Sequence, residues 1–216
     1  MGDRSHWENV YRTKPPHEVS WYRAHLDTSL ALIDAAVPDH SAHVIDVGGG
    51  ASTLVDDLLA RGYRNVTVLD LSSAALDIAK ARLGESARAI EWRCDDVTTA
   101  PMPEHRYDLW HDRAVFHFLT SAEDRAAYVR QVRRCVKAGG HVIIATFGPD
   151  GPAKCSGLDV VRYGAEGLQA ELGPAFRLER QLTDLHETPA GKIQPFTYCC
   201  WRFDGEGHAA VGDGKG

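Results

Sequence analysis

The chain has 216 residues, of which 44% are hydrophobic and 25% are charged, and its formal net charge is −6. This composition is typical of one globular domain. It lacks the basic block that would indicate a nucleic-acid partner and the apolar run of roughly 20 residues that a membrane span needs. The five cysteines form no CxxC pair, and the polar N-terminus lacks the apolar core of a signal peptide. We therefore expect a reduced, cytoplasmic protein.

Strand-like and helix-like segments alternate from residue 43 onwards. Apolar runs that are typical of strands buried on both faces occupy 43–47, 65–71, 89–93, 107–111 and 141–147. Between them, apolar residues at helical spacing predict helices after residue 53, over 74–84 and over 122–137. This order indicates a doubly wound, mostly parallel α/β sheet.

The two ends of the chain differ from this repeat. Segments 176–187 and 192–203 are both strand-like, and the turn-forming TPAG between them requires an antiparallel hairpin. Residues 1–40 are aromatic-rich and helix-prone, and they precede a domain at 41–203. The tail at 204–216 is rich in glycine, and we expect it to be flexible.

The first predicted strand runs into a glycine loop, VIDVGGGAST. Such loops usually bind a phosphate at a helix N-terminus. Here Thr53 stands where a dinucleotide fingerprint has its third glycine, and Asp46 would repel a phosphate but attract a cation. S-adenosylmethionine is a ligand of that kind, because it carries a sulfonium and an ammonium and no phosphate. An ordinary structural turn is the alternative for a glycine loop taken alone.

Acidic residues also follow the next two strands. Asp70 ends the second strand, where a carboxylate can bind both hydroxyls of a ribose, with a helix cap as the alternative. Asp95 and Asp96 follow the third strand, where one of them can bind an adenine amino group, with a solvated loop acid as the alternative. These positions lie at the carboxyl ends of strands, the edge at which such sheets bind ligands.

The motifs DVGGGAS, VLDLS, CDDV and KAGGHVIIATF, spread over 43–147, resemble those of class I S-adenosylmethionine-dependent methyltransferases. The resemblance implies a Rossmann-like sheet of seven strands with the last strand inserted antiparallel. It implies S-adenosylmethionine as the cofactor and S-adenosylhomocysteine as the product. The implied contacts are Asp46, Gly48, Gly49 and Gly50 at the methionine end, Asp70 and Leu71 at the ribose, and Asp96 and Val97 at the adenine. Asp95 stands where a glycine is common, so the choice between Asp95 and Asp96 stays open.

The stretch WHDRAVFHF follows the fourth strand, over the expected position of the cofactor's sulfur. Arg113 is predicted to stabilise an anionic nucleophile and Asp112 to orient it, and the alternative is a pair or helix cap that fixes the loop. His117, between two phenylalanines, is interpreted as a packed histidine. Together with DRAAY this stretch resembles the thiopurine S-methyltransferase group.

The N-terminal stretch HWENVYRTKPPHEVSWY also resembles that group. The likeness implies that residues 1–40 fold over the cofactor as a helical cap. The aromatic side chains expected to cover it are Trp7, Tyr11, Trp21 and Tyr22. An aromatic wall beside a sulfonium has a physical reason, because ring faces attract cations. Ordinary helix packing is the alternative for these residues.

The C-terminal hairpin resembles the same region of tellurite-resistance methyltransferases, which makes His186 a candidate base. A surface histidine is the alternative, and Glu187 stands where that group has an arginine. The loop 148–163 suits a lid or a substrate wall, and Cys155 within it is interpreted as a partly buried thiol. Cys199 and Cys200 point to opposite faces of a strand, so we expect no metal site there.

The sequence therefore predicts a monomeric methyltransferase that acts on a small soft nucleophile: a thiol, a selenol or a metalloid. An arginine such as Arg113 raises the reactive thiolate fraction of a thiol. The alternative is a protein lysine methyltransferase, which PAKCSGLDVVRY and the hairpin also resemble, with Asp112 or Glu187 as the slot for lysine. A nicotinamide oxidoreductase, which Thr53 and Asp46 argue against, and a catalytically silent cofactor-binding module complete the hypotheses.

Overall fold

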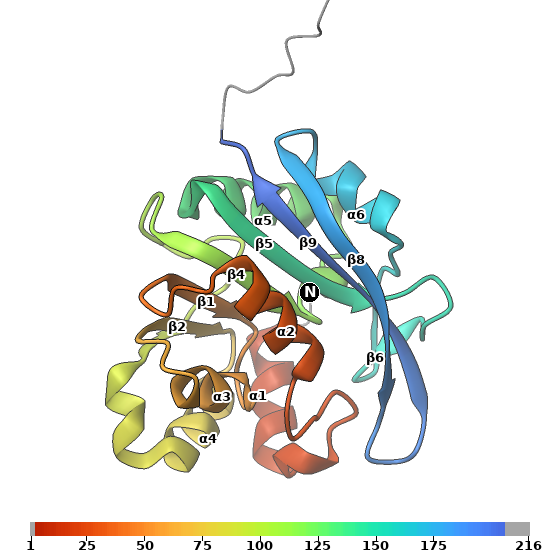
Figure 1. The fold of residues 1–216 in the computed structure, drawn as a ribbon. Coiled ribbons are helices and arrows are strands. Elements are labelled where there is room, and N and C mark those ends of the chain that lie inside the picture. The colour runs from red at the N-terminus through yellow and green to blue at the C-terminus, as the bar shows by residue number, and fades with distance from the viewer. Residues whose placement is uncertain (1–2, 206–216) are drawn as a thin grey trace, which may run out of the picture.

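The structure, a computed structural model, describes residues 3–205, so most of the tail predicted at 204–216 lies outside the described residues. Seven strands of this part form one sheet in the order β3–β2–β1–β4–β5–β9–β8 (Figure 1). The parallel strands are β1 (His43–Val47), β2 (Asn65–Asp70), β3 (Glu91–Cys94), β4 (Tyr107–Arg113) and β5 (Val136–Phe147). The antiparallel hairpin is β8 (Phe176–Glu187) and β9 (Ile193–Phe203), with β9 against β5. The predicted Rossmann-like sheet and its terminal hairpin are confirmed.

Helices cover both faces of this sheet. One face carries α2 (Asp27–Ala36), α3 (Leu54–Ala60) and α4 (Ser73–Leu83), and the other carries α5 (Ala122–Cys135) and α6 (Ala165–Leu172). The remaining elements are α1 (Arg4–Thr13), the 3-10 turns η1 (Pro16–Glu18), η2 (Gly84–Ala89) and η3 (Phe116–Phe118), and a small ribbon of β6 (Lys154–Cys155) and β7 (Leu158–Asp159). The helix expected to reach residue 137 ends at Cys135, because β5 begins at Val136, earlier than predicted.

Side chains alternate between the two faces along each central strand, as the pleat requires. In β4, Leu109 packs in the core under α2 and α3, and Trp110 packs in the core under α5 and α6. His111 and Arg113 therefore share the face of Leu109, and Asp112 shares the face of Trp110. This alternation decides which polar residues of β4 can meet in the site described below.

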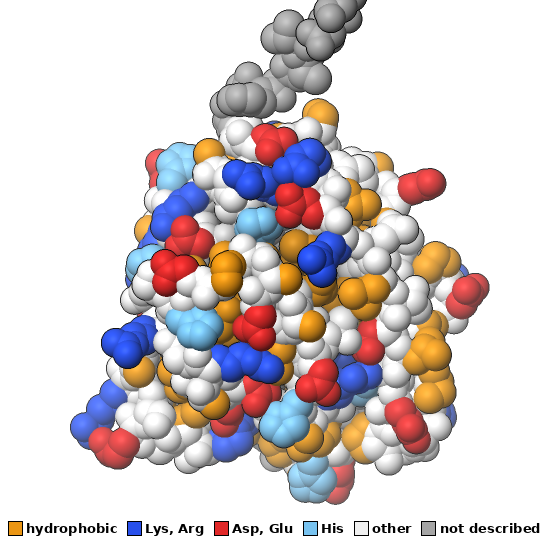
Figure 2. Space-filling view, in the orientation of Figure 1, with side chains coloured by type: hydrophobic (Ala, Val, Ile, Leu, Met, Phe, Trp, Pro, Cys, Tyr) orange, Lys and Arg blue, Asp and Glu red, His pale blue; other side chains and the backbone are white. Residues whose placement is uncertain are grey.

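The surface mixes acidic and basic side chains without a large block of either sign on the face shown in Figure 2. Exposed hydrophobic side chains belong mainly to the β8–β9 hairpin, where Leu185 and Ile193 are 64% and 55% exposed. Among residues 3–205, no helix combines the length and the apolar character that crossing a membrane requires.

Candidate functional site

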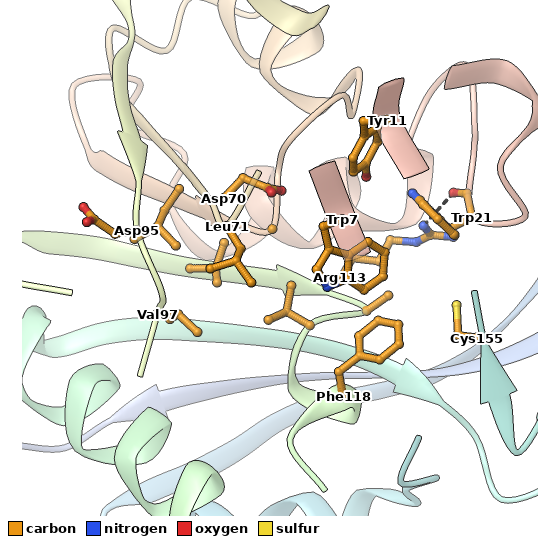
Figure 3. A pocket seen from close by; sticks show the side chains of 15 residues that line it. Trp7, Tyr11, Trp21, Asp70, Leu71, Asp95, Val97, Arg113, Phe118 and Cys155 are labelled. Carbon is orange, nitrogen blue, oxygen red and sulfur yellow. Dashed lines mark hydrogen bonds between the residues drawn. The ribbon is translucent and has the colours of Figure 1, made fainter. Parts of the chain in front are cut away.

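A cleft lies at the carboxyl ends of β1, β2 and β4, and the N-terminal segment forms one of its walls (Figure 3). The space between its walls is about 650 Å³, part of it open to solvent. The residues that line it include Trp7, Tyr11, Trp21, Gly48, Asp70, Leu71, Asp95, Val97, Arg113, Phe118 and Cys155. We call this the main cleft.

A smaller cleft adjoins the main cleft, and we call it the side cleft. Both are lined by Tyr11, Trp21, Gly48 and Arg113. The walls that belong to the side cleft alone include Tyr22, Arg23, Asp46, Ser52 and His111. The two hollows thus meet at Arg113 and at the glycine loop.

The glycine loop is shaped by the carboxylates beneath it. A Cβ atom at Gly49 would collide with Oδ2 of Asp46, and one at Gly50 would lie 2.6 Å from Oδ2 of Asp70. Gly50 also has a φ of +28°, which disfavours other residues. Positions 49 and 50 therefore require glycine, because the backbone of the loop passes directly over two carboxylates.

Asp46 is buried, with 3% of its surface exposed. Its Oδ1 lies 2.7 Å from Nδ1 of His111, and its Oδ2 is buried without a hydrogen-bond partner among the described residues. A buried carboxylate oxygen without a donor is costly, and a bound cation would remove that cost. The position fits the ammonium group expected at the methionine end of the cofactor.

Asp70 lines the main cleft at the end of β2. Its Oδ1 accepts a hydrogen bond from the backbone N–H of Ser72, at 2.8 Å. Burial raises the pKa of Asp70 to about 7, and the negative charges of Asp46 and Glu8 add to this shift. The carboxylate is short of donors, which the two hydroxyls of a ribose would supply.

Of the two acids after β3, Asp95 and not Asp96 lines the main cleft, together with Val97. The Oδ1 of Asp96 accepts hydrogen bonds from the backbone N–H and the hydroxyl of Thr98, at 2.8 and 2.7 Å. The Asp96 carboxylate thus closes a local turn. Asp95 forms an ion pair with Arg93 at 3.5 Å.

Arg113 ends β4 at the junction of the two clefts. Its Nε donates to the hydroxyl of Tyr198 at 2.9 Å. Its Nη1 donates to the backbone oxygen of Trp21 at 3.0 Å, the contact dashed in Figure 3. Its guanidinium carbon lies 4.5 Å from the ring centre of Phe196. Its Nη2 is buried and has no protein partner within residues 3–205, so one donor group is free for a ligand.

Asp112 points to the opposite face of the sheet, as the alternation along β4 requires. It is fully buried and accepts hydrogen bonds from the backbone N–H of Val115 and Phe116, at 2.9 and 3.0 Å, and from the hydroxyl of Tyr128 at 2.7 Å. Burial raises its pKa to about 6, although these hydrogen bonds oppose the shift. These contacts are those of a cap that fixes the loop, which is the alternative that the sequence left open for Asp112. Asp112 does not line either cleft.

His186 is buried rather than on the surface, and it lines neither cleft. Its Nε2 lies 2.7 Å from the backbone oxygen of Ser20, and Nε of Arg23 donates to its Nδ1 at 3.0 Å. Burial lowers the pKa of His186 to about 4. Since both ring nitrogens are engaged, the contacts tie the hairpin to the N-terminal segment and do not support a role as a base.

Other predicted side chains pack as interpreted. His117 is buried between Phe118 and Phe147, and burial lowers its pKa to about 3. Cys155 lines the main cleft, and burial raises its pKa to about 12. Cys199 and Cys200 belong to the cores on opposite faces. Within the described part of the chain, no three His, Cys, Asp or Glu side chains are grouped so as to hold a metal ion.

The N-terminal segment reaches the main cleft with three aromatic side chains. The ring of Trp7 lies 5.9 Å from that of Trp21 and 5.1 Å from that of Phe118, both edge to face, and Tyr11 lies 6.3 Å from Trp21. Trp7, Tyr11 and Trp21 thus line the main cleft together. Tyr22 lines the side cleft instead.

Sequence reasoning did not assign a role to His111, Ser29 or Tyr198. His111 is 1% exposed, and its Nε2 lies 2.9 Å from the hydroxyl of Ser29 in α2. One signal was present, because His111 lies two positions before Arg113 in β4 and therefore points to the same face of the sheet. Nothing local to Ser29 or Tyr198 indicated a contact with the site.

Residues 44–140 match the family model described as a methyltransferase domain. The protein named ubiquinone biosynthesis O-methyltransferase from Nitrosomonas europaea is 32% identical over 142 residues, which are 65% of this chain and 57% of that protein. The protein of the same name from Pseudomonas aeruginosa is 28% identical over 141 residues, with the same shares. The chain thus spans 57% of the length of these curated relatives.

Solved structures share the fold at low identity. A 1,6-didemethyltoxoflavin-N1-methyltransferase from Burkholderia thailandensis, with S-adenosylhomocysteine bound, has a TM-score of 0.69 at 20% identity, covering 93% of this chain and 86% of that one. A SAM-dependent methyltransferase from Anabaena variabilis has a TM-score of 0.71 at 17% identity, covering 94% and 96%. At these identities the likeness shows the fold.

Proposed function

We propose that this protein transfers a methyl group from S-adenosylmethionine to a small acceptor with a soft, anionic nucleophile. The reaction would use the methyltransferase domain of residues 44–140 and the segments that complete its clefts. The matching family model is that of a methyltransferase domain, and a solved structure of the same fold holds S-adenosylhomocysteine, which supports the domain class and the cofactor. The acceptor and the roles of individual residues are our proposal.

The described residues fit the cofactor. The free Oδ2 of Asp46 suits the ammonium group, and Asp70 suits the ribose hydroxyls. Leu71, Val97 and the carboxyl-end acids surround the space for the adenine. When bound, S-adenosylmethionine supplies an electrophilic methyl group on a sulfonium. We assign residues 3–40 as the cover of this site, because Trp7 and Trp21 form its wall.

The observation that carries the acceptor proposal is the free Nη2 of Arg113, buried at the junction of the clefts. A fixed positive charge there favours the anionic form of an acceptor and so raises the fraction of thiolate or selenolate at neutral pH. The anion's lone pair can then form the bond to the methyl carbon as the carbon–sulfur bond of the sulfonium breaks. The rings of Trp7, Trp21 and Phe118 give the main cleft an apolar wall against which a small molecule can pack.

The arrangement argues against the lysine alternative. A protonated lysine would be repelled by Arg113, and the two carboxylates considered for it are elsewhere: Asp112 faces α5, and Glu187 is exposed on β8. The carboxylates that line the clefts, Asp46, Asp70 and Asp95, lie at the expected cofactor positions. A lysine slot would therefore lack its acidic partner.

A phenolic oxygen is the second candidate acceptor. The curated relatives carry the name of an O-methyltransferase, and the edge-to-face rings of Trp7, Trp21 and Phe118 suit a flat aromatic ring. A phenolate, like a thiolate, is an anion that Arg113 would stabilise. The thiol and phenol proposals therefore share the role of Arg113 and differ in the acceptor atom.

An acceptor screen tests the proposal. Purified protein with S-adenosylmethionine would be offered small aliphatic and aromatic thiols, selenols, phenols, arsenite, tellurite and lysine peptides, with formation of S-adenosylhomocysteine as the readout. We expect turnover with thiols or selenols. Turnover confined to phenols would select the second candidate, and turnover confined to lysine peptides would contradict both.

A further inference from the structure

Four buried polar residues and the half-buried Arg113 form one continuous hydrogen-bond chain between the glycine loop and the junction of the clefts. From the glycine loop outwards, Asp46 contacts His111 at 2.7 Å, and His111 contacts the hydroxyl of Ser29 at 2.9 Å. The hydroxyls of Ser29 and Tyr198 are 3.5 Å apart, and Nε of Arg113 donates to the Tyr198 hydroxyl at 2.9 Å. The exposed fractions of Asp46, His111, Ser29 and Tyr198 are 3%, 1%, 0% and 2%.

The contacts of the chain can be followed from Arg113 to Asp46. Arg113 can only donate, so the Tyr198 oxygen accepts from it, and the same oxygen also accepts from the Ser29 hydroxyl. The two ring nitrogens of His111 continue the path, with Nε2 beside the Ser29 hydroxyl and Nδ1 beside the Asp46 carboxylate. Each of the five side chains is thus hydrogen-bonded to its neighbour in the path, and such buried polar networks make their members rigid.

The two ends of the chain are the two ligand-binding groups of the proposed function. One oxygen of Asp46 is held by His111, and the other is free for the cofactor's ammonium. Two nitrogens of Arg113 are held, by Tyr198 and by the Trp21 backbone, and Nη2 is free. Each end thus has one side fixed by protein and one side left open.

We propose that His111, Ser29 and Tyr198 are positioning residues. They hold the carboxylate for the cofactor and the guanidinium for the acceptor at fixed relative positions. This inference rests on the proposed function, because it assigns ligands to both ends. In-line displacement at a methyl group requires the nucleophile and the sulfonium to be aligned closely, so a link that fixes both ends contributes directly to that alignment.

Ser29 is the decisive position for a test. It lies in α2, lines neither cleft and contacts neither proposed ligand, yet it is the middle of the chain. In Ser29→Ala we expect S-adenosylhomocysteine to bind about threefold to tenfold more weakly, measured by calorimetry, and kcat to fall about tenfold, a range typical of groups that orient a ligand-binding side chain. The matched control is Thr146→Val, which removes another fully buried hydroxyl, one without a partner in the described chain.

Two other variants should separate the effect on kcat, at the Arg113 end of the chain, from the effect on cofactor affinity, at the Asp46 end. Tyr198→Phe keeps the ring and removes the hydroxyl beside Arg113, so we expect kcat to fall while the affinity for S-adenosylhomocysteine changes less than twofold. His111→Phe removes the contact with Asp46, so we expect that affinity to fall at least tenfold. Thermal unfolding of each variant, followed beside the control, shows that it is folded.

Two results would overturn the link. If Ser29→Ala matches Thr146→Val in both affinity and kcat, the chain does not position the site, although the proposed function stands. If the wild-type protein does not bind S-adenosylhomocysteine at all, the proposed function fails and the link fails with it. Losses at both ends in Ser29→Ala, with the control unchanged, would support the proposal.

Discussion

The Oε1 of Glu8 in α1 accepts a hydrogen bond from the backbone N–H of Ser73, the first residue of α4, at 2.6 Å. It also accepts from the Ser73 hydroxyl at 3.0 Å and from the backbone N–H of Ala74 at 3.4 Å. Free N–H groups at a helix N-terminus favour a carboxylate. Glu8 therefore anchors α1 to the N-terminus of α4. It lies one position after Trp7 and three before Tyr11, the two α1 residues that line the main cleft.

We predict that Glu8→Ala loosens this wall. The affinity for S-adenosylhomocysteine should fall about threefold to tenfold, and the free energy of unfolding should fall by about 1 kcal/mol, as for the loss of a helix cap. Calorimetry and limited proteolysis of the N-terminal segment would measure the two effects. Glu85→Ala is the control, because the Glu85 side chain is 83% exposed in a surface pair. An affinity equal to that of the control would show that α1 does not cover the ligand.

The raised pKa of Asp70 predicts a pH-dependent affinity. Ribose hydroxyls donate to the ionised carboxylate, and in the free protein this form predominates only above a pKa of about 7. Binding of S-adenosylhomocysteine should therefore weaken as the pH falls below 7 and release a proton near pH 7. Calorimetry in buffers of different ionisation enthalpy would measure both. Asp70→Asn should bind more weakly and lose this dependence, and a wild-type affinity that is constant from pH 5.5 to 8 would contradict the role of Asp70.

The same pKa predicts a stability effect without ligand. The folded value, about 7, lies above the ordinary value of 3.8, so the folded state holds the proton more tightly. Stability contributed by this group is present below about pH 4 and is lost as the pH rises to 7. Asp70→Asn removes that loss, so its melting temperature should exceed that of the wild type by several degrees at pH 8 and differ little below pH 4. A lower melting temperature for the variant at pH 8 would contradict the shift.

Arg113→Ala should separate turnover from cofactor binding. The variant loses the free Nη2 donor, so we expect kcat with a thiol to fall at least 100-fold, while the affinity for S-adenosylhomocysteine changes about threefold or less. Arg113→Lys keeps the charge but cannot keep both anchoring contacts, so it should restore only part of the rate. Arg88→Ala serves as a control, since the Arg88 side chain is 82% exposed. Equal losses of rate and affinity would make Arg113 a structural residue.

Asp112 should behave as a structural residue. Asp112→Ala leaves the hydroxyl of Tyr128 and two backbone N–H groups without their acceptor in the core, and we expect the free energy of unfolding to fall by about 3 kcal/mol. Chemical denaturation would measure the loss. The folded fraction at low temperature should bind S-adenosylhomocysteine with nearly the wild-type affinity. A large loss of kcat with an unchanged free energy of unfolding would instead assign Asp112 a role in the reaction.

Much of the candidate site was predictable because it depends on local sequence pattern and on one topological rule: open α/β sheets bind ligands at the carboxyl ends of their strands. A buried strand followed by a glycine loop placed Asp46, and the carboxyl end of the next strand placed Asp70. The period of two along β4 also separates Asp112 from Arg113, because adjacent residues of a strand point to opposite faces of the sheet. Predicting a shared role for the two neglected that alternation.

The hairpin shows where local pattern was insufficient. The sequence indicated two antiparallel strands over 176–187 and 192–203, and the structure confirms the pairing. The environment of His186 could not be predicted in this way, because its partners, Ser20 and Arg23, lie more than 160 positions away in the chain. Their contacts bury the ring and hold both nitrogens, which removes the candidate base from the acceptor.

The sequence by itself determined the class of sheet, the position of the acids at its carboxyl edge and the presence of an arginine beside them. These features follow from periodicity and from short motifs, which act within a few residues. The tertiary structure alone decided which polar groups are left without a protein partner. Within residues 3–205, one oxygen of Asp46 and one nitrogen of Arg113 stay without a partner, while His111 of β4, Tyr198 of β9 and the Trp21 backbone hold their other polar atoms.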